Sequence, residues 1–272
     1  MLQGYMCPDS KKVSFSQCLS CNQDEKCLPK IFRLAILLNT QFRGPEITVT
    51  NLLNCLRKTY YEKTHDYWIE PAKAYNSFRG SIIHSILAEL SQQEFKGEDE
   101  LCGVINSFLG NLVVEKRYSK KVNGCFLSGA IDCYDKETKT LYDFKSYKAI
   151  EYLLREGCAK PEHVWQTNIY KWLLPYPVEK IKIVYITLGG VYVTGHQYDI
   201  IKKRKTGDIV EKYQLAEVEL KSDEEIAQFI EPRIKILDAA LNKGGSLPPV
   251  VEESGRWICQ FCSFRSECES VK

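Results

Sequence analysis

The chain has 272 residues, a formal net charge of +2, 44% hydrophobic residues and 26% charged residues. This composition is ordinary for a globular protein and leaves room for one substantial α/β core with a small accessory module. The nearly neutral balance excludes binding of nucleic acid through bulk positive charge, so any such surface has to be local.

No run of 18 or more apolar residues is present, and the segment from Met1 to Asp9 lacks a basic start followed by an apolar stretch. We therefore expect no membrane partner, no secretory signal and a cytoplasmic location. Twelve cysteines are unusual there, because disulfides are rare in a reducing cytosol. Thiolate ligation of metal explains eight of them. The other four are expected to be small buried residues, namely Cys102, Cys125, Cys133 and Cys158.

The first 30 residues are rich in cysteine and turn formers and have little room for a core of their own. An apolar run predicts a helix over 31–42, which Gly44-Pro45 ends. Thr50 is the expected N-cap of the next helix, which carries Cys55. A longer helix is expected over 76–93. Its apolar stripe surrounds His84 and consists of Ile82, Ile83, Ile86, Leu87 and Leu90.

Five strands are expected, over 112–115, 126–134, 140–147, 181–188 and 191–198. A polar turn joins the second and third of these strands as a hairpin, and Gly189-Gly190 joins the last two. A helix over 161–174 separates the two hairpins. Another helix begins at a capping box of Ser222 and Glu225 and is bent or split by Pro232. The order of elements predicts a mixed α/β fold built on one sheet.

Two acidic residues and a lysine lie on the strands of the first predicted hairpin. Asp132 ends the sequence Gly129-Ala-Ile-Asp132, and Asp143-Phe-Lys145 lies on the neighbouring strand. The hairpin brings the two carboxylates together at one sheet edge, and the period of two places Lys145 on the same face as Asp143. Carboxylate oxygens suit Mg²⁺ or Mn²⁺, and Lys145 is expected to orient a water or to stabilise charge in a phosphoryl-transfer transition state. Acid-x-Lys triplets also occur elsewhere in the chain, so the strand setting is what distinguishes this one.

With two further motifs, this pattern resembles the RecB-like branch of the PD-(D/E)XK nucleases. Arg79-Gly-Ser-Ile-Ile-His84 is similar to the upstream helical histidine motif of that branch, and Gln166-Thr-Asn-Ile-Tyr170 to its Gln-x-x-x-Tyr motif. The resemblance implies a restriction-endonuclease-like mixed sheet flanked by helices. It implies that His84 joins Asp132 and Asp143 as a ligand of Mg²⁺ or Mn²⁺. It also implies that Gln166 and Tyr170 contact DNA or brace the site.

Three cysteines, Cys259, Cys262 and Cys268, lie close together near the end of the sequence. Tetrahedral thiolate sites take four ligands, and Cys55 is the candidate for the fourth. One cysteine before the core and three behind it is also the arrangement of iron–sulfur RecB-like nucleases, among which the CRISPR-associated exonucleases (Cas family four) fit best. That likeness implies a 4Fe–4S cluster, with zinc as the alternative metal. Because it would join positions 204 residues apart, the cluster is expected to be structural.

The second cysteine set, Cys7, Cys18, Cys21 and Cys27, is local and repeats the x₂ and x₅ spacing of the C-terminal set. It predicts a compact Cys₄ knuckle that needs its metal to fold, with zinc favoured over a second iron–sulfur cluster. This module lies outside the resemblance. The chain is therefore expected to consist of a metal-binding module with a helix over 1–45 and a nuclease domain over 46–272.

Together these features predict a metal-dependent DNA nuclease. The family resemblance implies that it acts as an exonuclease on single-stranded ends, in CRISPR spacer acquisition or in DNA end processing. The expected partners are DNA and either a CRISPR integrase complex or a helicase. Basic stretches at 117–121 and 202–205 are candidates for phosphate contacts. One alternative is a catalytically silent DNA-binding or scaffold subunit. Another makes the N-terminal knuckle an element that recruits a protein.

Overall fold

The structure is a computed structural model that describes residues 1–21, 27–41, 46–97, 99–147, 159–187, 213–251, 258–260 and 262–270. The chain divides into two compact units, each made of several stretches of sequence. The first unit comprises Met1–Ile82, Ser119–Ser128 and Ala227–Lys272, and the second comprises Ile83–Tyr118 and Gly129–Ile226.

The N-terminal part of the first unit is a small sheet with two helices. Its strands are β1 (Leu2–Met6), β2 (Lys12–Ser14) and β4 (Tyr67–Ile69), in the order β2-β1-β4. Helix α1 (Phe15–Ser20) follows β2, and α2 (Lys30–Gln41) is the helix that the sequence predicts over 31–42.

A buried centre consisting of Tyr5, Cys18 and Ile36 holds this sheet and its helices together, with Val13, Phe15, Leu28, Ile69 and Phe78 packed against it. As expected, residues 1–30 do not form a core of their own. They share a core with α2 and β4, which supply apolar side chains that the first 30 residues lack.

The helix expected after Thr50 consists of two shorter helices, α3 (Val49–Leu53) and α4 (Leu56–Thr64). The N-cap of α3 is Thr48 rather than Thr50, because the side chains of Thr48 and Asn51 accept hydrogen bonds from each other's backbone N–H groups. Cys55 occupies the N-cap of α4. The thiol expected within a helix therefore lies at a helix N-terminus. The two-residue strand β3 (Ile47–Thr48) pairs in parallel with the start of β6 (Cys125–Asp135).

The second unit is built on a mixed sheet in which β6 pairs antiparallel with β7 (Thr140–Tyr147). This pairing confirms the first predicted hairpin. Strand β7 pairs in parallel with β8 (Lys180–Thr187), and β8 pairs antiparallel with β9 (Tyr213–Val218). Strand β5 (Leu112–Val122) also pairs with β6 and is longer than the predicted 112–115.

The sequence-based prediction of this sheet is tested only in part. The second predicted hairpin, with its turn at Gly189-Gly190 and its strand over 191–198, lies outside the described residues. Strand β9 was not predicted, and it is the described partner of β8 on that side. The described residues form two sheets rather than one, because the N-terminal strands pair among themselves.

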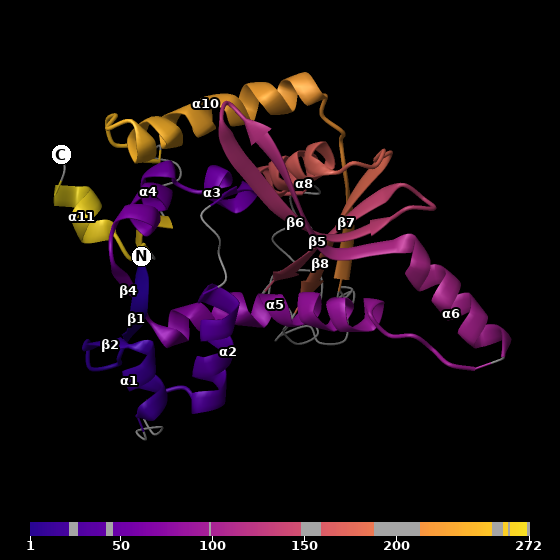
Figure 1. Cartoon of the computed structure of the whole chain (residues 1–272), viewed down its shortest axis with the longest axis horizontal. Coiled ribbons are helices and arrows are strands. Elements are labelled where there is room, and N and C mark those ends of the chain that lie inside the picture. Colours follow the sequence, from indigo (N-terminus) through magenta and orange to yellow (C-terminus); the bar gives the residue numbers. More distant parts are fainter. Residues whose placement is uncertain are drawn as a thin grey trace, which may run out of the picture. The chain divides into compact units, whose positions relative to one another are not determined.

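Three helices accompany the second sheet, and Figure 1 shows their places in the chain. Helix α5 (Pro71–Ser91) starts before the predicted 76, and α6 (Glu100–Asn111) was not predicted. Helix α8 (Pro161–Leu173) matches the prediction and packs against β7 and β8. The apolar stripe predicted on α5 is partly exposed, since Ile82, Ile86 and Leu90 are 44%, 52% and 43% exposed.

Helix α10 (Asp223–Asn242) begins as predicted at the reciprocal bonds between Ser222 and Glu225. It continues as one helix through Pro232, so the predicted split does not occur. Its apolar side is fully buried at Ile226, Ile230, Ile234 and Leu237. Pro232 lies on the exposed side, and the buried side chains on both sides of it hold the helix together. The last described helix is α11 (Arg265–Ser270).

The four cysteines expected to be small buried residues do not behave alike. Cys133 is buried, as expected. Cys102 and Cys125 are only half-buried and donate their S–H groups to Asp99 and Asp238. Cys158 lies outside the described residues.

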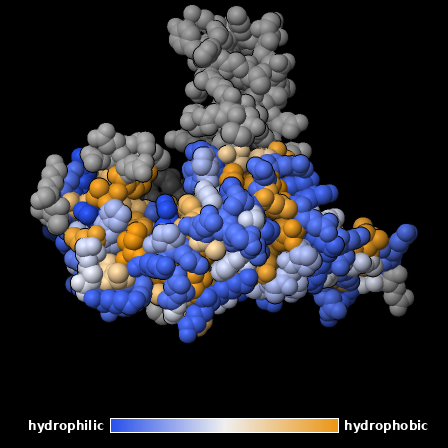
Figure 2. Space-filling model, turned by 90° about the horizontal axis from the view of Figure 1, so that it is seen from above, coloured by the Kyte–Doolittle hydropathy of each residue, from blue (hydrophilic) through white to orange (hydrophobic). Residues whose placement is uncertain are grey.

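The predicted fold class, mixed α/β with a mixed sheet flanked by helices, is confirmed. Within the described part of the chain, no helix has the length and apolar character needed to cross a membrane. Hydrophilic residues cover much of the face that Figure 2 shows, with apolar residues scattered among them.

Strands β1 and β2 lie so close together at Gly4 that a larger residue does not fit there. A Cβ atom at Gly4 would lie 1.9 Å from the Val13 carbonyl oxygen. Gly4→Ala should therefore lower the free energy of unfolding by about 1–3 kcal/mol, because the hairpin has to open. The matched control is Gly103→Ala on the exposed face of α6, where a Cβ meets nothing within 4 Å. That change should stabilise the protein by about 0.5–1 kcal/mol through helix propensity. Equal thermal unfolding of the two variants would contradict this account of β1 and β2.

Candidate active site

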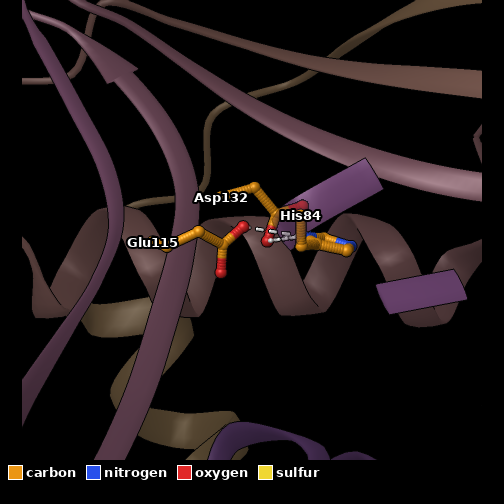
Figure 3. Close-up of side chains that lie close together, drawn as sticks. All are labelled: His84, Glu115 and Asp132. Carbon is orange, nitrogen blue, oxygen red and sulfur yellow. Dashed lines mark hydrogen bonds and ion pairs between the residues drawn. The ribbon is translucent and has the colours of Figure 1, made fainter. Parts of the chain in front are cut away.

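Three side chains from three different elements of the second unit converge on one point. His84 lies on α5, Glu115 on β5 and Asp132 on β6. The Nδ1 atom of His84 is 2.8 Å from Glu115 Oε1 and 3.4 Å from Asp132 Oδ1. One ligand atom from each residue lies within 4.8 Å of the others, and Figure 3 shows both carboxylates directed at the imidazole. Imidazole and carboxylate groups at this spacing form a donor set for a divalent cation.

Glu115 is the member of this group that the sequence did not reveal. It has a φ of 49°, a left-handed backbone conformation that is uncommon for a residue with a side chain. Such conformations gather at functional sites. The one available signal was an acidic residue at the end of the apolar run Leu112-Val-Val-Glu115. The hydrogen bond that Glu115 accepts from the His84 imidazole is the largest contribution that raises the pKa of His84, and the negative charge of Asp132 adds to it against the opposing effect of burial.

Asp143 and Lys145 lie on β7 beside Asp132. Lys145 Nζ is 2.7 Å from Asp143 Oδ2, and the Asp143 residue is only 1% exposed. Despite this ion pair, neither oxygen of Asp143 accepts a hydrogen bond from the described residues. Asp132 Oδ2 accepts a hydrogen bond of 2.7 Å from the backbone N–H of Phe144. The structure therefore brings together the two carboxylates and the lysine that the sequence singled out, although Asp143 lies outside the 4.8 Å group.

Burial and like charge oppose the ionisation of Asp132. Removal from water is the larger cause and the negative charge of Asp143 the second, and together they raise the pKa of Asp132 to about 7. The positive charges of Lys145 and His84 and the N–H of Phe144 offset part of this effect. Two carboxylates that share one buried space need a cation, and Lys145 supplies one positive charge for two negative ones.

Gln166 and Tyr170 lie on successive turns of α8 and interact with each other. Gln166 Nε2 donates to the Tyr170 hydroxyl at 2.8 Å. Burial raises the pKa of Tyr170, and the charges of Asp143 and Asp132 add to the effect. The tyrosine hydroxyl thus stays protonated within the electrostatic reach of both carboxylates.

Gly129 explains how the Tyr170 ring approaches the strand that carries Asp132. A Cβ at Gly129 would lie 2.7 Å from Tyr170 Cε1 and 3.0 Å from Leu173 Cδ1. The glycine of the Gly-x-x-Asp sequence therefore leaves room for the α8 side chains, because it has no Cβ atom.

The remaining histidines differ in their surroundings. His163 Nδ1 lies 3.0 Å from the hydroxyl of the fully buried Tyr185, which pairs in register with Lys145. Burial and the nearby charge of Lys145 lower the pKa of His163 to about 3, so this imidazole is neutral. His65 is exposed at the end of α4, and His196 lies outside the described residues.

Cys55 and the C-terminal cysteines lie in the first unit. Helix α4, which Cys55 caps, contacts the C-terminal segment, because the Tyr61 ring stacks on Phe264 at 5.5 Å. Burial raises the pKa of the Cys262 thiol, and the thiols of Cys55 and Cys259 add to this effect. These contacts gather the residues of the expected iron–sulfur site around one end of α4.

The N-terminal cysteines also lie near one another. Burial, the Asp9 carboxylate and the thiols of Cys18, Cys27 and Cys21 raise the pKa of Cys7. Among the residues that the structure describes, neither cysteine set brings three sulfur atoms within 4.8 Å of one another. The identity of the metal at either set stays a prediction.

Of the two basic stretches predicted to contact phosphate, the structure describes only 117–121. Residues 202–205 lie outside the described residues. Arg117 and Lys121 are exposed on β5, the strand that also carries Glu115. Exposed basic residues on that strand suit a polyanionic ligand.

The residues of this site fit a divalent metal. The buried carboxylate of Asp143 has no hydrogen bond from the described residues, and a second buried carboxylate, an imidazole and Glu115 lie near it. Hard oxygen donors with one imidazole favour Mg²⁺ or Mn²⁺.

No protein-family model and no curated protein matches the sequence. Solved structures are similar to it. The crystal structure of SSO0001 has a TM-score of 0.51 and 19% sequence identity and covers 88% of this chain and 94% of that chain. A phage related exonuclease from Haemophilus somnus 129PT has a TM-score of 0.33 and 14% identity, with coverage of 59% and 81%. An alkaline exonuclease from Laribacter hongkongensis has a TM-score of 0.36 and 11% identity, with coverage of 73% and 90%. The likeness to SSO0001 shows a shared fold.

Asp132 should make the stability of the protein depend on pH when chelator removes divalent metal. Its pKa is raised in the folded state from an ordinary value of about 3.9, so the stability that it contributes is present at low pH and is lost as pH rises through about 7. Asp132→Asn keeps an oxygen for the Phe144 N–H and removes the charge. In EDTA it should melt a few degrees above wild type at pH 8, and the difference should shrink at pH 5. A difference that does not change with pH would contradict the raised pKa.

Glu115 should contribute to metal affinity, either as an oxygen ligand or by orienting His84. Glu115→Gln is expected to weaken Mn²⁺ binding by about 10–100-fold, as measured by titration calorimetry at pH 7.5. The control is Glu217→Gln on β9, whose side chain is 77% exposed and pairs with Lys182. It should bind Mn²⁺ as wild type does. Wild-type affinity in the Glu115 variant would remove this residue from the site.

Proposed function

We propose that this protein is a Mg²⁺- or Mn²⁺-dependent DNA nuclease of the RecB-like PD-(D/E)XK type that degrades single-stranded DNA from its ends. The observation that carries the proposal is the pair of buried carboxylates, Asp132 and Asp143, with the Lys145 ammonium 2.7 Å from one of them. His84, Gln166 and Tyr170 complete the order of residues on which the family resemblance rests.

The proposed ligands of the catalytic metal are His84, Asp132 and Asp143, with Glu115 added on the strength of its distance to His84. Such an ion supplies Lewis-acid polarisation of a phosphodiester. The hydrogen bond from the Phe144 N–H fixes one oxygen of Asp132 and leaves Oδ1 directed at His84. A fixed carboxylate needs little rearrangement when it binds a ligand, which favours catalysis by preorganisation.

Lys145 is the proposed group that orients the attacking water or stabilises negative charge on the phosphate. Its ammonium lies beside Asp143, and its side chain is 19% exposed, so it reaches both the buried carboxylate and the surface. The neutral state of His163 avoids a second positive charge next to Lys145. Gln166 holds the hydroxyl of Tyr170 in place, so that this protonated group can donate a hydrogen bond to DNA or brace the carboxylates.

A structural 4Fe–4S cluster bound by Cys55, Cys259, Cys262 and Cys268 belongs to the same proposal. The contacts between α4 and the C-terminal segment support it, since they hold residues far apart in the sequence next to each other. The cluster would fix these contacts by closing a long loop of chain. The proposal also includes a nuclease domain over 46–272, which serves CRISPR spacer acquisition or DNA end processing. The metal-binding module over 1–45 is joined to it, because β1 pairs with β4.

The activity test uses end-labelled linear single-stranded DNA with Mn²⁺. Asp143→Asn and Lys145→Met should each lower the rate by about 100-fold or more, because the first removes a charged metal ligand and the second removes the ammonium that acts on the water or the phosphate. The matched control is Lys182→Met on the neighbouring strand β8, where the lysine pairs with Glu217 at 3.5 Å. It should keep the wild-type rate.

Circular single-stranded DNA separates an exonuclease from an endonuclease, since it offers no end. Resistance of the circle together with cleavage of the linear strand supports attack at ends. If wild type with its full metal content cleaves neither substrate, the protein is the catalytically silent DNA-binding subunit instead.

A further inference from the structure

A buried arginine lies beside the N-terminal cysteines, outside the candidate active site. Arg33 on α2 is 1% exposed, and its guanidinium donates from Nη1 to the carbonyl oxygen of Cys18 at 2.8 Å. The same nitrogen lies 3.5 Å from Cys18 Sγ, within hydrogen-bonding distance of sulfur. Cys18 itself is 4% exposed. A cation and a sulfur atom are thus buried together.

This contact is one that a metal-bound sulfur would make. Burying a guanidinium is costly unless an anion or several acceptors surround it. A neutral thiol is a weak acceptor, whereas a thiolate accepts a charge-assisted hydrogen bond. A buried thiolate is in turn stable only beside a cation or bound to a metal. Arg33 therefore lies where a metal-bound Cys18 sulfur would accept its hydrogen bond.

The thiols of this cysteine set lie near one another, since those of Cys18, Cys27 and Cys21 all raise the pKa of Cys7. Cys7 follows β1 in a tight turn, where its N–H donates to the Lys11 carbonyl at 2.9 Å. Cys21 ends α1, and its N–H donates to the Cys18 carbonyl at 3.2 Å, so this carbonyl accepts from both Cys21 and Arg33. Four thiolates around a divalent ion carry a net charge of about −2, and one buried guanidinium offsets half of it.

The C-terminal cysteine set shows the same two features. The N–H of Cys262 donates to the Cys259 carbonyl at 3.1 Å, as Cys21 does to Cys18. Arg57 Nη1 lies 3.9 Å from Cys268 Sγ, and its Nε donates to the Pro248 carbonyl. Two cysteine sets with the same spacing thus each have an arginine directed at one sulfur.

Tyr5 contacts both Arg33 and Cys18 and so keeps them next to each other. The hydroxyl of the fully buried Tyr5 donates to the Arg33 carbonyl at 2.7 Å. Tyr5 also packs against Cys18 in the core of the N-terminal sheet. Gly4, next to Tyr5, lets β2 approach closely enough to place α1 and Cys18 there. The arginine contact is therefore part of the packed core and not a surface encounter.

We propose that Cys7, Cys18, Cys21 and Cys27 bind a metal as thiolates, and that Arg33 holds this metal by donating a hydrogen bond to the Cys18 sulfur. Arg33 is a positioning residue rather than a ligand. Zinc and an iron–sulfur cluster both take four thiolates, and this contact suits either of them. The proposal does not depend on nuclease activity.

The test counts metal in the full chain after anaerobic purification, by elemental analysis for zinc and iron with an assay for sulfide. Cys21→Ser should lose one complete metal group, either one zinc ion or one cluster, and keep the other group. An unchanged metal content in Cys21→Ser overturns the site. A zinc count and an iron–sulfide count support it equally and identify the metal.

Arg33 is tested by the rate at which chelator removes metal from the N-terminal set. Arg33→Gln should lose that metal about 10–100-fold faster than wild type, and Arg33→Lys, which keeps the charge, should be intermediate. The control is Lys11→Gln, which removes an exposed charge next to Cys7 without touching sulfur. It should lose metal at the wild-type rate. If Arg33→Gln also does so, the role of Arg33 is overturned.

A measurement on the wild-type chain covers the case in which these variants do not fold. Iodoacetamide labelling with peptide mass spectrometry reports which thiols are protected. The four N-terminal cysteines should be protected in the native chain and should label rapidly once chelator has removed metal. Equal labelling before and after chelation overturns the proposal.

Discussion

The proximity of two buried carboxylates is the constraint on which the second unit depends. Asp132 and Asp143 lie on the paired strands β6 and β7, and both are almost completely removed from water. Their mutual repulsion and their burial oppose ionisation, which is why the pKa of Asp132 is raised. Lys145 compensates in part. A protein gains nothing in stability from this arrangement, so its presence in a core points to the binding of a cation.

Several features around the carboxylates serve to keep them in place. Asp132 is fixed by a backbone N–H of the neighbouring strand, and Tyr170 approaches the same strand only because residue 129 is glycine. Helix α8, which carries Tyr170, is anchored at its start by Tyr185, whose hydroxyl accepts the backbone N–H of Lys160. The sheet and α8 therefore hold the carboxylates and Tyr170 in fixed positions, and the surrounding apolar residues limit their contact with water.

The cysteine-rich first unit also places charged side chains next to groups that can carry the opposite charge. There, the guanidinium groups of the buried Arg33 and the partly buried Arg57 lie beside sulfur atoms, whereas in the second unit an ammonium lies beside carboxylates. In both cases a buried polar group lies close to a group of opposite or potentially opposite charge. The metal proposed at the carboxylates would balance their charge and serve catalysis. The metals proposed at the cysteines would balance the thiolate charge and stabilise the fold.

Local pattern was sufficient for the elements whose periodicity is strong. The hairpin of β6 and β7 was predictable from alternation and a polar turn, and α8 and α10 were predictable from their apolar spacing and, for α10, a capping box. The same hairpin register allowed Asp132, Asp143 and Lys145 to be placed together from sequence. The start of α3 was misjudged, because Thr48 and Thr50 are both suitable caps and Asn51 decides between them.

The sequence by itself determined the type of the strongly periodic elements and the residues that share one hairpin, because these follow from spacing along the chain. Only the tertiary structure decided what comes from distant segments. It brought Glu115 on β5 to His84 on α5, paired β4 with β1 to complete the N-terminal core, and placed Arg33 against Cys18. Contacts of this kind depend on packing between elements, which leaves no periodic trace in the sequence.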